Sequence, residues 1–154
     1  MTTIKLSTHI KAPILTVFDL SRDISEHEAS TKNSREKAIA GVTSGKISLG
    51  ETVTWRAKHF GFYLTHTSLI TAFESPTYFV DEMTKGVFKS LHHEHIFKEA
   101  DGVTEMIDIF KYEVPYSIFG KLFNYFILKS YLTKFLFERN KHIKQKAEFL
   151  ALKD

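Results

Sequence analysis

The segment SLHHEHIFKEADGVTEMIDIFKYEV, residues 90–114, decides the fold class. Apolar and polar side chains alternate along both of its halves, which is the period of a β-strand with one buried face. Asp101 and Gly102 stand between the halves and form a dipeptide that favours a tight hairpin turn. The segment therefore predicts two long antiparallel strands.

The same period of two extends upstream and is interrupted at turn residues. We expect six strands in the middle of the chain, at residues 36–45, 51–60, 62–74, 77–85, 87–99 and 103–114, and a seventh in TIKLSTHIKA, residues 3–12. Two short helices are expected after this N-terminal strand. Pro13 suits the first position of one, over residues 14–20, and the other covers residues 24–29.

Beyond Pro115 the apolar period becomes helical, and Ser117 is a candidate cap for a helix from about Ile118 to about Ala151. One apolar stripe along this helix is expected to contact the sheet: Leu128, Leu132, Leu136, Ile143, Ala147 and Leu150. The sequence thus predicts an α+β helix-grip fold, in which a curved seven-stranded antiparallel sheet grips a long C-terminal helix. One helix covers less area than such a sheet offers, so a hollow is expected between them.

Length and composition fit one domain over residues 1–154. The absence of Cys excludes disulfides and thiolate metal sites. The first residues lack the apolar stretch of a signal peptide, and lysines interrupt the most apolar helix, so we expect a cytoplasmic protein without a membrane span.

The formal charge of +3 comes from the C-terminal segment alone. Residues 121–154 carry eight Lys and Arg against three Asp and Glu, whereas residues 1–120 carry thirteen against fifteen. These basic residues are spread around the predicted helix without a platform of stacking aromatics, which argues against nucleic acid as a partner.

Several stretches, in this order and spacing, resemble the START-like superfamily, also called SRPBCC, which includes the birch-pollen-allergen fold and polyketide cyclase-like proteins. They are IKAPILTVFDLSRDISEHEAS, GVTSGKISLGETVTW, FVDEMTKGVF, HEHIF, TEMIDIFKYEVP and FLFERN. Two residues depart from the pattern: Met83 stands where Gln is common, and Val87 where Pro often follows the Gly. The resemblance implies the pocket of a bacterial ligand-binding protein for lipids, hormones, quinones, polyketides or aromatic compounds, and does not imply a particular reaction.

Strand alternation sorts the histidine-rich segment into two faces. His92 and Glu94 point outward, as do Lys111 and Glu113 on the next strand, because charged side chains prefer water. The inner face then carries Leu91, His93, His95 and Phe97, together with Met106, Asp108, Phe110 and Tyr112.

His93, His95 and Asp108, with His59 nearby, admit three roles. They can act as general acid and base, because a carboxylate raises and desolvation lowers the pKa of an imidazole. They can bind zinc through three nitrogens and a carboxylate. They can also satisfy one another and orient the polar end of a ligand, which is the role we favour; we expect no metal and no cofactor.

The remaining candidate ligand-binding residues come from three other places. Trp55 and His59 share the inner face of their strand, and Phe79, Asp81 and Met83 share that of another, although a β-bulge would exchange Asp81 for Glu82. Phe123 and Phe126 come from the C-terminal helix, where they form a second apolar group with Phe119 and Phe137.

This second group continues into Lys141 and Lys144. Such a flank can touch a membrane surface weakly, or pack against the short helices or a second subunit. We favour packing, in a monomer or a homodimer.

We therefore expect a non-enzymatic protein that carries or senses a small hydrophobic, aromatic or amphipathic ligand in the internal cavity. One alternative is a cyclase or dehydratase that uses His93, His95 and Asp108 in the same cavity. The other is a module that docks on a membrane or a protein.

Overall fold

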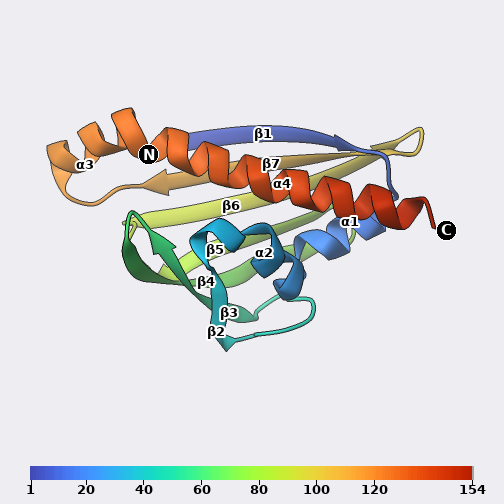
Figure 1. The fold of residues 1–154 in the computed structure, drawn as a ribbon, viewed down its shortest axis with the longest axis horizontal. Coiled ribbons are helices and arrows are strands. Elements are labelled where there is room, and N and C mark those ends of the chain that lie inside the picture. Colours follow the sequence, from blue (N-terminus) through green and yellow to red (C-terminus); the bar gives the residue numbers. More distant parts are fainter. Residues whose placement is uncertain (154) are drawn as a thin grey trace.

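A seven-stranded antiparallel sheet forms most of the protein in the computed structural model, which describes residues 1–153. The strands are β1 (Thr2–Ile10), β2 (Lys37–Gly41), β3 (Thr52–His59), β4 (Phe62–Glu74), β5 (Tyr78–Lys85), β6 (Ser90–Ala100) and β7 (Val103–Glu113). Their order in the sheet is β1-β7-β6-β5-β4-β3-β2, so that the first strand pairs with the last. The sheet is strongly curved, and its concave side faces the helices (Figure 1).

β2 is shorter than the predicted strand at residues 36–45. It ends at Gly41, whose φ of 73° favours glycine, and a Cβ there would lie 2.1 Å from the carbonyl oxygen of Thr52. A bulge between Ala38 and Ala40 also interrupts its pairing with β3. β2 is therefore a short edge strand.

Two short helices, α1 (Ile14–Ser21) and α2 (Ile24–Ser30), follow β1, and a 3-10 turn, η1 (Lys32–Ser34), leads into β2. Pro13 directly precedes α1. The side chain of Asp23 caps α2 by accepting hydrogen bonds from the backbone nitrogens of Ser25 and Glu26. The predicted pair of short helices after the first strand is confirmed.

The predicted long C-terminal helix is confirmed, and it contains a π-helical segment that the sequence did not predict. It consists of α3 (Ser117–Phe123), a π-helical segment η2 (Asn124–Leu128) and α4 (Lys129–Ala151). Ser117 is the first residue of α3 and does not cap it. The π-helical segment begins at Asn124, which accepts a hydrogen bond from the Tyr112 hydroxyl and donates one to Thr2 Oγ1.

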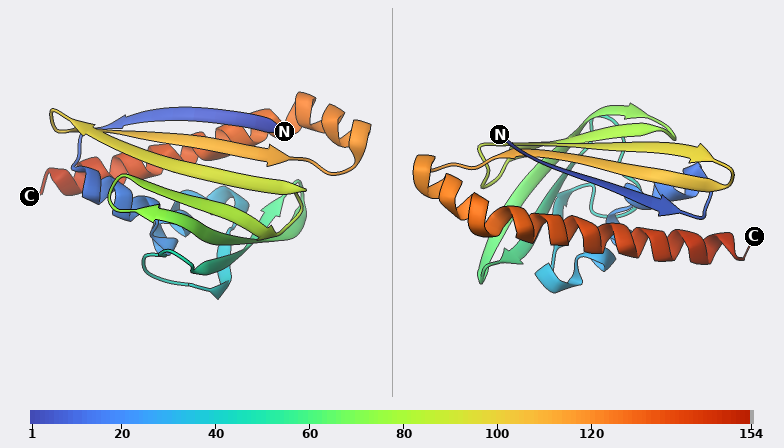
Figure 2. Two further views of the ribbon diagram at one scale, coloured as in Figure 1. Left: turned by 180° about the vertical axis from the view of Figure 1, so that it is seen from behind. Right: turned by 90° about the horizontal axis from the view of Figure 1, so that it is seen from above.

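α4 crosses the concave side of the sheet, as the view from above shows (Figure 2). Five of the six predicted stripe residues are buried, and Leu150 is half-buried. The backbone of α4 lies closest to β1, α1 and α2. The middle strands lie further from it, so side chains and the cavity described below occupy the space between.

The α+β helix-grip prediction is confirmed by this architecture. Within residues 1–153, no helix has the length and apolarity that crossing a membrane requires.

Candidate functional site

A cavity of about 190 Å³ lies between the concave side of the sheet and α4. Its wall is mostly apolar, with polar groups from β4, β5, β6 and α4. Thr65 and Val87 belong to the wall and are exposed, so the cavity reaches the surface beside the connection from β5 to β6. Eight of the candidate ligand-binding residues line it: Trp55, His59, Phe79, Asp81, Leu91, His93, His95 and Phe110.

The other seven candidates lie outside the cavity wall, which corrects the predicted site. They are Met83, Phe97, Met106, Asp108, Tyr112, Phe123 and Phe126. Phe97 and Met106 lie under α1, where the Phe18 ring meets Phe97 with centroids 5.4 Å apart and Ser21 Oγ donates to Met106 Sδ. The cavity does not extend along the whole concave face, because α1 covers one end of that face.

The other candidates fail to reach the cavity wall for separate reasons. Tyr112 is covered by the π-helical segment through its hydrogen bond to Asn124. Met83 packs at the edge of the core cluster that contains Leu91 and Leu132. Phe123 and Phe126 lie on the outer side of the helix, where they are 41% and 70% exposed.

Asp81, His93, His95 and Asp108 form one contiguous cluster across β5, β6 and β7. Asp81 pairs with His93 across the β5–β6 ladder, and His95 pairs with Asp108 across the β6–β7 ladder. These inward positions place the two imidazole rings 3.8 Å apart between centroids, with a carboxylate on either side. Phe79 stacks on His95 at 4.1 Å.

Asp108 is fully buried behind the two histidines. His93 Nε2 lies 2.9 Å from its Oδ1, Arg139 donates to the same oxygen at 3.4 Å, and Asn140 Nδ2 donates to Oδ2 at 2.7 Å. Because both oxygens are occupied and neither faces the cavity, Asp108 is not placed to take a proton from a ligand. The cyclase or dehydratase alternative thereby loses its proposed carboxylate.

Of the two carboxylates in this cluster, Asp81 is the one that faces the cavity. Its Oδ2 lies 3.0 Å from His95 Nε2 and 3.7 Å from His93 Nδ1, and its Oδ1 accepts a hydrogen bond from Ser68 Oγ at 3.3 Å. The sequence left open whether Asp81 or Glu82 points to the inner face. A bulge near Ala72 does occur in β4, but Asp81 keeps the inward position in β5.

Burial and hydrogen bonding set the charges of the cluster. Burial lowers the pKa of His93 to about 4; the neighbouring His95 acts in the same direction, and Asp108 opposes it only in part. Burial by itself would raise the pKa values of Asp81 and Asp108. Hydrogen bonds from His95 to Asp81 and from His93 to Asp108 outweigh it, so both pKa values lie below their ordinary range. At neutral pH, His93 is neutral and both carboxylates are ionised.

Sequence reasoning missed a second polar group at the cavity wall. His66 Nε2 lies 2.8 Å from Ser68 Oγ, and His27 Nε2 lies 3.1 Å from Glu36 Oε2. Arg139 also reaches the wall from α4. His66 alternates inward with Leu64 and Ser68 on β4, a pattern that was available in the sequence, whereas His27 and Glu36 come from helix and loop positions that strand alternation does not address.

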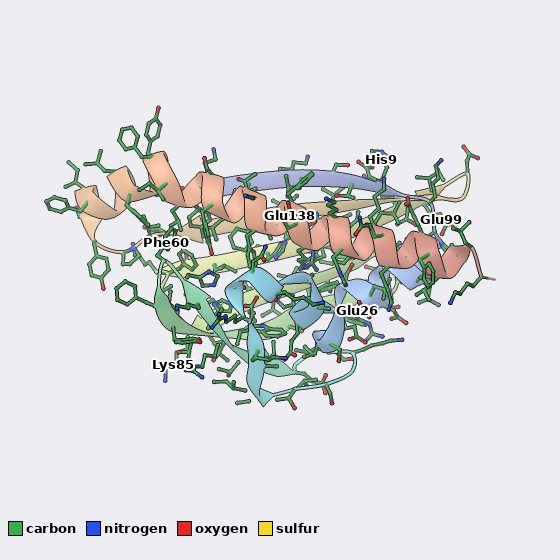
Figure 3. All side chains as sticks on the ribbon, viewed as in Figure 1. His9, Glu26, Phe60, Lys85, Glu99 and Glu138 are labelled. Atoms are coloured by element: carbon green, nitrogen blue, oxygen red, sulfur yellow. The ribbon has the colours of Figure 1, made fainter. Side chains whose placement is uncertain are left out.

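The second apolar group of the C-terminal helix is exposed. Phe119 is 80% and Phe126 70% exposed, so the prediction that this flank packs against the short helices is wrong within the chain. Phe60, at the tip of the β3–β4 hairpin, reaches the same end of the molecule (Figure 3), where its ring lies 5.5 Å from Phe123. We call this surface the apolar end; it comprises the exposed residues Phe60, Phe62, Tyr63, Tyr116, Ile118, Phe119, Leu122, Phe123, Tyr125, Phe126 and Ile127.

Comparison with solved structures identifies the fold. The protein TTHA0849 from Thermus thermophilus superposes with a TM-score of 0.73 at 16% identity over 92% of this chain and 97% of that one. A START superfamily protein from Mycobacterium smegmatis gives 0.72 at 12% identity, over 96% and 98% of the two chains. The protein has the START-like fold. A major latex-like protein from Panax ginseng shares this START-like fold, with a TM-score of 0.67 at 16% identity over 95% and 97% of the two chains.

The expected resemblance is thus confirmed at the level of the fold. No protein-family model matches the sequence, and no curated protein matches it. At identities of 16% or less, these structures establish the START-like fold.

Proposed function

We propose that the protein binds a compact hydrophobic or amphipathic molecule in the cavity between the sheet and α4, as a carrier or sensor. The observation that supports this function is the apolar cavity with Asp81, His93 and His95 in one part of its wall. An engineered apolar cavity of about 150 Å³ binds benzene, so about 190 Å³ suits a molecule of roughly one ring.

Affinity would come from both ends of such a ligand. A single aromatic ring buries about 150–250 Å², which at about 25 cal/mol per Å² contributes roughly 4–6 kcal/mol before ordering costs. That contribution alone corresponds to a dissociation constant of about 1 mM to 0.04 mM. Tighter binding needs polar contacts, and Asp81 and the two histidines are placed to hold a donor group of the ligand.

Trp55 offers a direct test because it is the only tryptophan and lies in the cavity wall. Single-ring phenols, amines and carboxylic acids are titrated into the protein while Trp55 emission is recorded. Native mass spectrometry of freshly purified protein, followed by a denatured extract, searches for a co-purified molecule. Saturable emission changes or a bound molecule support the proposal; unchanged emission with the whole panel and an empty protein contradict it.

A second function, docking on an anionic membrane surface, is favoured by the apolar end. Residues 115–137 contain three lysines and no acidic residue, and Lys121, Lys129 and Lys134 are all exposed. Exposed aromatic rings enter the membrane interface, and the lysines complement anionic head groups. The cavity opening near Val87 would then let an amphipathic ligand pass between the membrane and the protein.

Lys141 and Lys144, which the sequence suggested as the basic part of this flank, are less suitable. Lys144 Nζ donates to the carbonyl oxygen of His9, at 2.8 Å, away from α3.

Flotation with vesicles of phosphatidylglycerol, compared with vesicles of phosphatidylcholine, tests docking on the membrane. Association with the anionic vesicles alone supports it. No association with either, or a stable dimer that buries the apolar end, would remove this second function.

A further inference from the structure

Both nitrogens of His95 lie beside carboxylate oxygens. His95 Nε2 lies 3.0 Å from Asp81 Oδ2, and His95 Nδ1 lies 3.0 Å from Asp108 Oδ1. The neutral form of an imidazole carries one N–H, which can serve only one of these two contacts. Of the side-chain polar atoms buried in residues 1–153, His95 Nδ1 is the one without a hydrogen-bond partner.

The charge of the cluster is also incomplete. Two carboxylates, Asp81 and Asp108, face one guanidinium, Arg139, which lies on the Asp108 side only. Asp81 has no Lys or Arg partner among the ion pairs of the described residues. A cation on the Asp81 side would balance this charge, and it would let the His95 proton move to Nδ1, where it faces Asp108.

We propose that Asp81, His93 and His95 bind a divalent transition-metal ion through Asp81 Oδ2, His93 Nδ1 and His95 Nε2. The sequence had suggested Asp108 as the carboxylate of a zinc set, and had led us to expect no metal. The metal site goes beyond the proposed ligand-binding function and does not depend on it.

The distances suit such an ion. Ligand atoms about 2.0–2.1 Å from a tetrahedral zinc ion are separated from one another by about 3.3 Å. Asp81 Oδ2 lies 3.0 Å from His95 Nε2 and 3.7 Å from His93 Nδ1, and one ligand atom from each of the three residues falls within 4.8 Å of the other two. Binding therefore needs side-chain shifts of a few tenths of an ångström to about one ångström.

The residues around the three ligands have the arrangement that supports metal binding. Histidines that bind metal usually donate their second N–H to a carboxylate, which fixes the tautomer and the ring orientation. Asp108 Oδ1 lies 2.9 Å from His93 Nε2, with which it forms a hydrogen bond, and 3.0 Å from His95 Nδ1, so one carboxylate oxygen stands beside the second nitrogen of each ring. Ser68 Oγ donates to Asp81 Oδ1 and orients the third ligand.

The donor set selects the class of ion. Two imidazoles and one carboxylate suit Zn²⁺, Fe²⁺ or Co²⁺, whereas Ca²⁺ and Mg²⁺ prefer oxygen donors throughout. All three ligands line the cavity, so an open coordination position would point into it. The ion would then offer a Lewis-acidic contact to an anionic or electron-rich group.

Calorimetric titration of chelator-treated protein with ZnCl₂, without any organic ligand, tests the site. We expect one Zn²⁺ per chain in the wild type. Asp81→Asn keeps the shape of the side chain but removes its charge, and should weaken binding by at least about 100-fold, since loss of outer-shell partners alone costs about 10–100-fold. The matched control is His92→Gln on the outer face of β6, where His92 contacts Glu82, and it should bind as the wild type does.

Nitrogen-15 NMR of the wild-type histidines gives a readout that does not rely on a variant folding. Zinc should leave His95 protonated at Nδ1 and unprotonated at Nε2, with Nε2 shifted by the metal. Three results would overturn the site: no zinc uptake by the wild type, His95 protonated on both nitrogens with zinc present, or equal affinities in wild type and Asp81→Asn. Because no ligand is added, these results are independent of whether the cavity binds an organic molecule.

Discussion

Arg139 on α4 and Asp108 on β7 form an ion pair inside the protein, with 3.4 Å between Arg139 Nη1 and Asp108 Oδ1. Both side chains are almost completely inaccessible to solvent. Arg139 also donates to the carbonyl oxygen of Ser21 and to Asn140 Oδ1, so the pair connects the last helix to the sheet and to α1. A buried charge is tolerated when it is paired and hydrogen-bonded in this way.

Removing either partner should therefore destabilise the protein strongly. Arg139→Met or Asp108→Asn leaves the opposite charge or its hydrogen-bonding groups without compensation, and we expect a loss of about 3–5 kcal/mol in the free energy of unfolding. Urea denaturation measures it. The control is Glu94→Gln, which breaks the partly exposed pair of Glu94 with Lys111 on the outer face and should cost about 0–1 kcal/mol. Similar losses of unfolding free energy from the buried pair and from the Glu94–Lys111 pair would contradict a special contribution of the buried pair to stability.

Filling the cavity should abolish ligand binding while the fold persists. Ala57 is buried in the wall, and Ala57→Leu extends a side chain into the empty volume. We expect at least a tenfold weaker response of Trp55 emission to whichever ring compound binds the wild type, at a cost of less than about 3 kcal/mol in stability. Ala40→Leu on β2 is the matched control, because Ala40 is exposed and should leave binding unchanged. Undiminished binding in Ala57→Leu would place the ligand elsewhere.

Polar substitutions at the apolar end should reduce association with anionic vesicles. Phe119→Ser together with Phe126→Ser removes two largely exposed rings, and should lower the partition coefficient about tenfold or more without a change in unfolding free energy above roughly 0.5 kcal/mol. Phe149→Ser serves as the control, since Phe149 is a similarly exposed ring near the other end of α4. Equal effects of the control and of the double variant would mean that the apolar end has no special role.

The Tyr112 hydroxyl should hold the π-helical segment in place. Tyr112→Phe removes the donor to Asn124 Oδ1, and we expect a loss of about 0.5–1.5 kcal/mol, with faster amide hydrogen exchange in residues 117–128. Tyr63→Phe is the control, because the Tyr63 ring is half-exposed and lies beneath Arg56 on the surface. Unchanged exchange in α3 and η2 would show that the π-helical segment does not depend on this bond.

Gly120 should also be needed for the position of α3. A Cβ at Gly120 would lie 1.9 Å from the carbonyl oxygen of Pro115, which is part of the backbone and cannot move independently. Gly120→Ala should therefore displace α3 and increase exchange in residues 117–123, although alanine is the better helix former. A stabilised α3 in this variant would contradict the close contact.

The sequence by itself determined the architecture, because strand and helix periods are local properties of the chain. Alternation in residues 90–114 placed His93 and His95 on one side and His92 and Glu94 on the other, and the turn residues separated the strands. The apolar stripe of the C-terminal helix likewise indicated which side contacts the sheet.

Only the tertiary structure decided which inward residues reach the cavity and which carboxylate faces it. Asp108 and Asp81 have the same kind of position in their strands, but α4 brings Arg139 and Asn140 to Asp108 and leaves Asp81 open. The exposure of Phe123 and Phe126 likewise became known only from the structure, because it depends on which elements cover that side of the helix. Periodicity gives the direction of a side chain, whereas its partners depend on contacts between residues far apart in the chain, which no local pattern records.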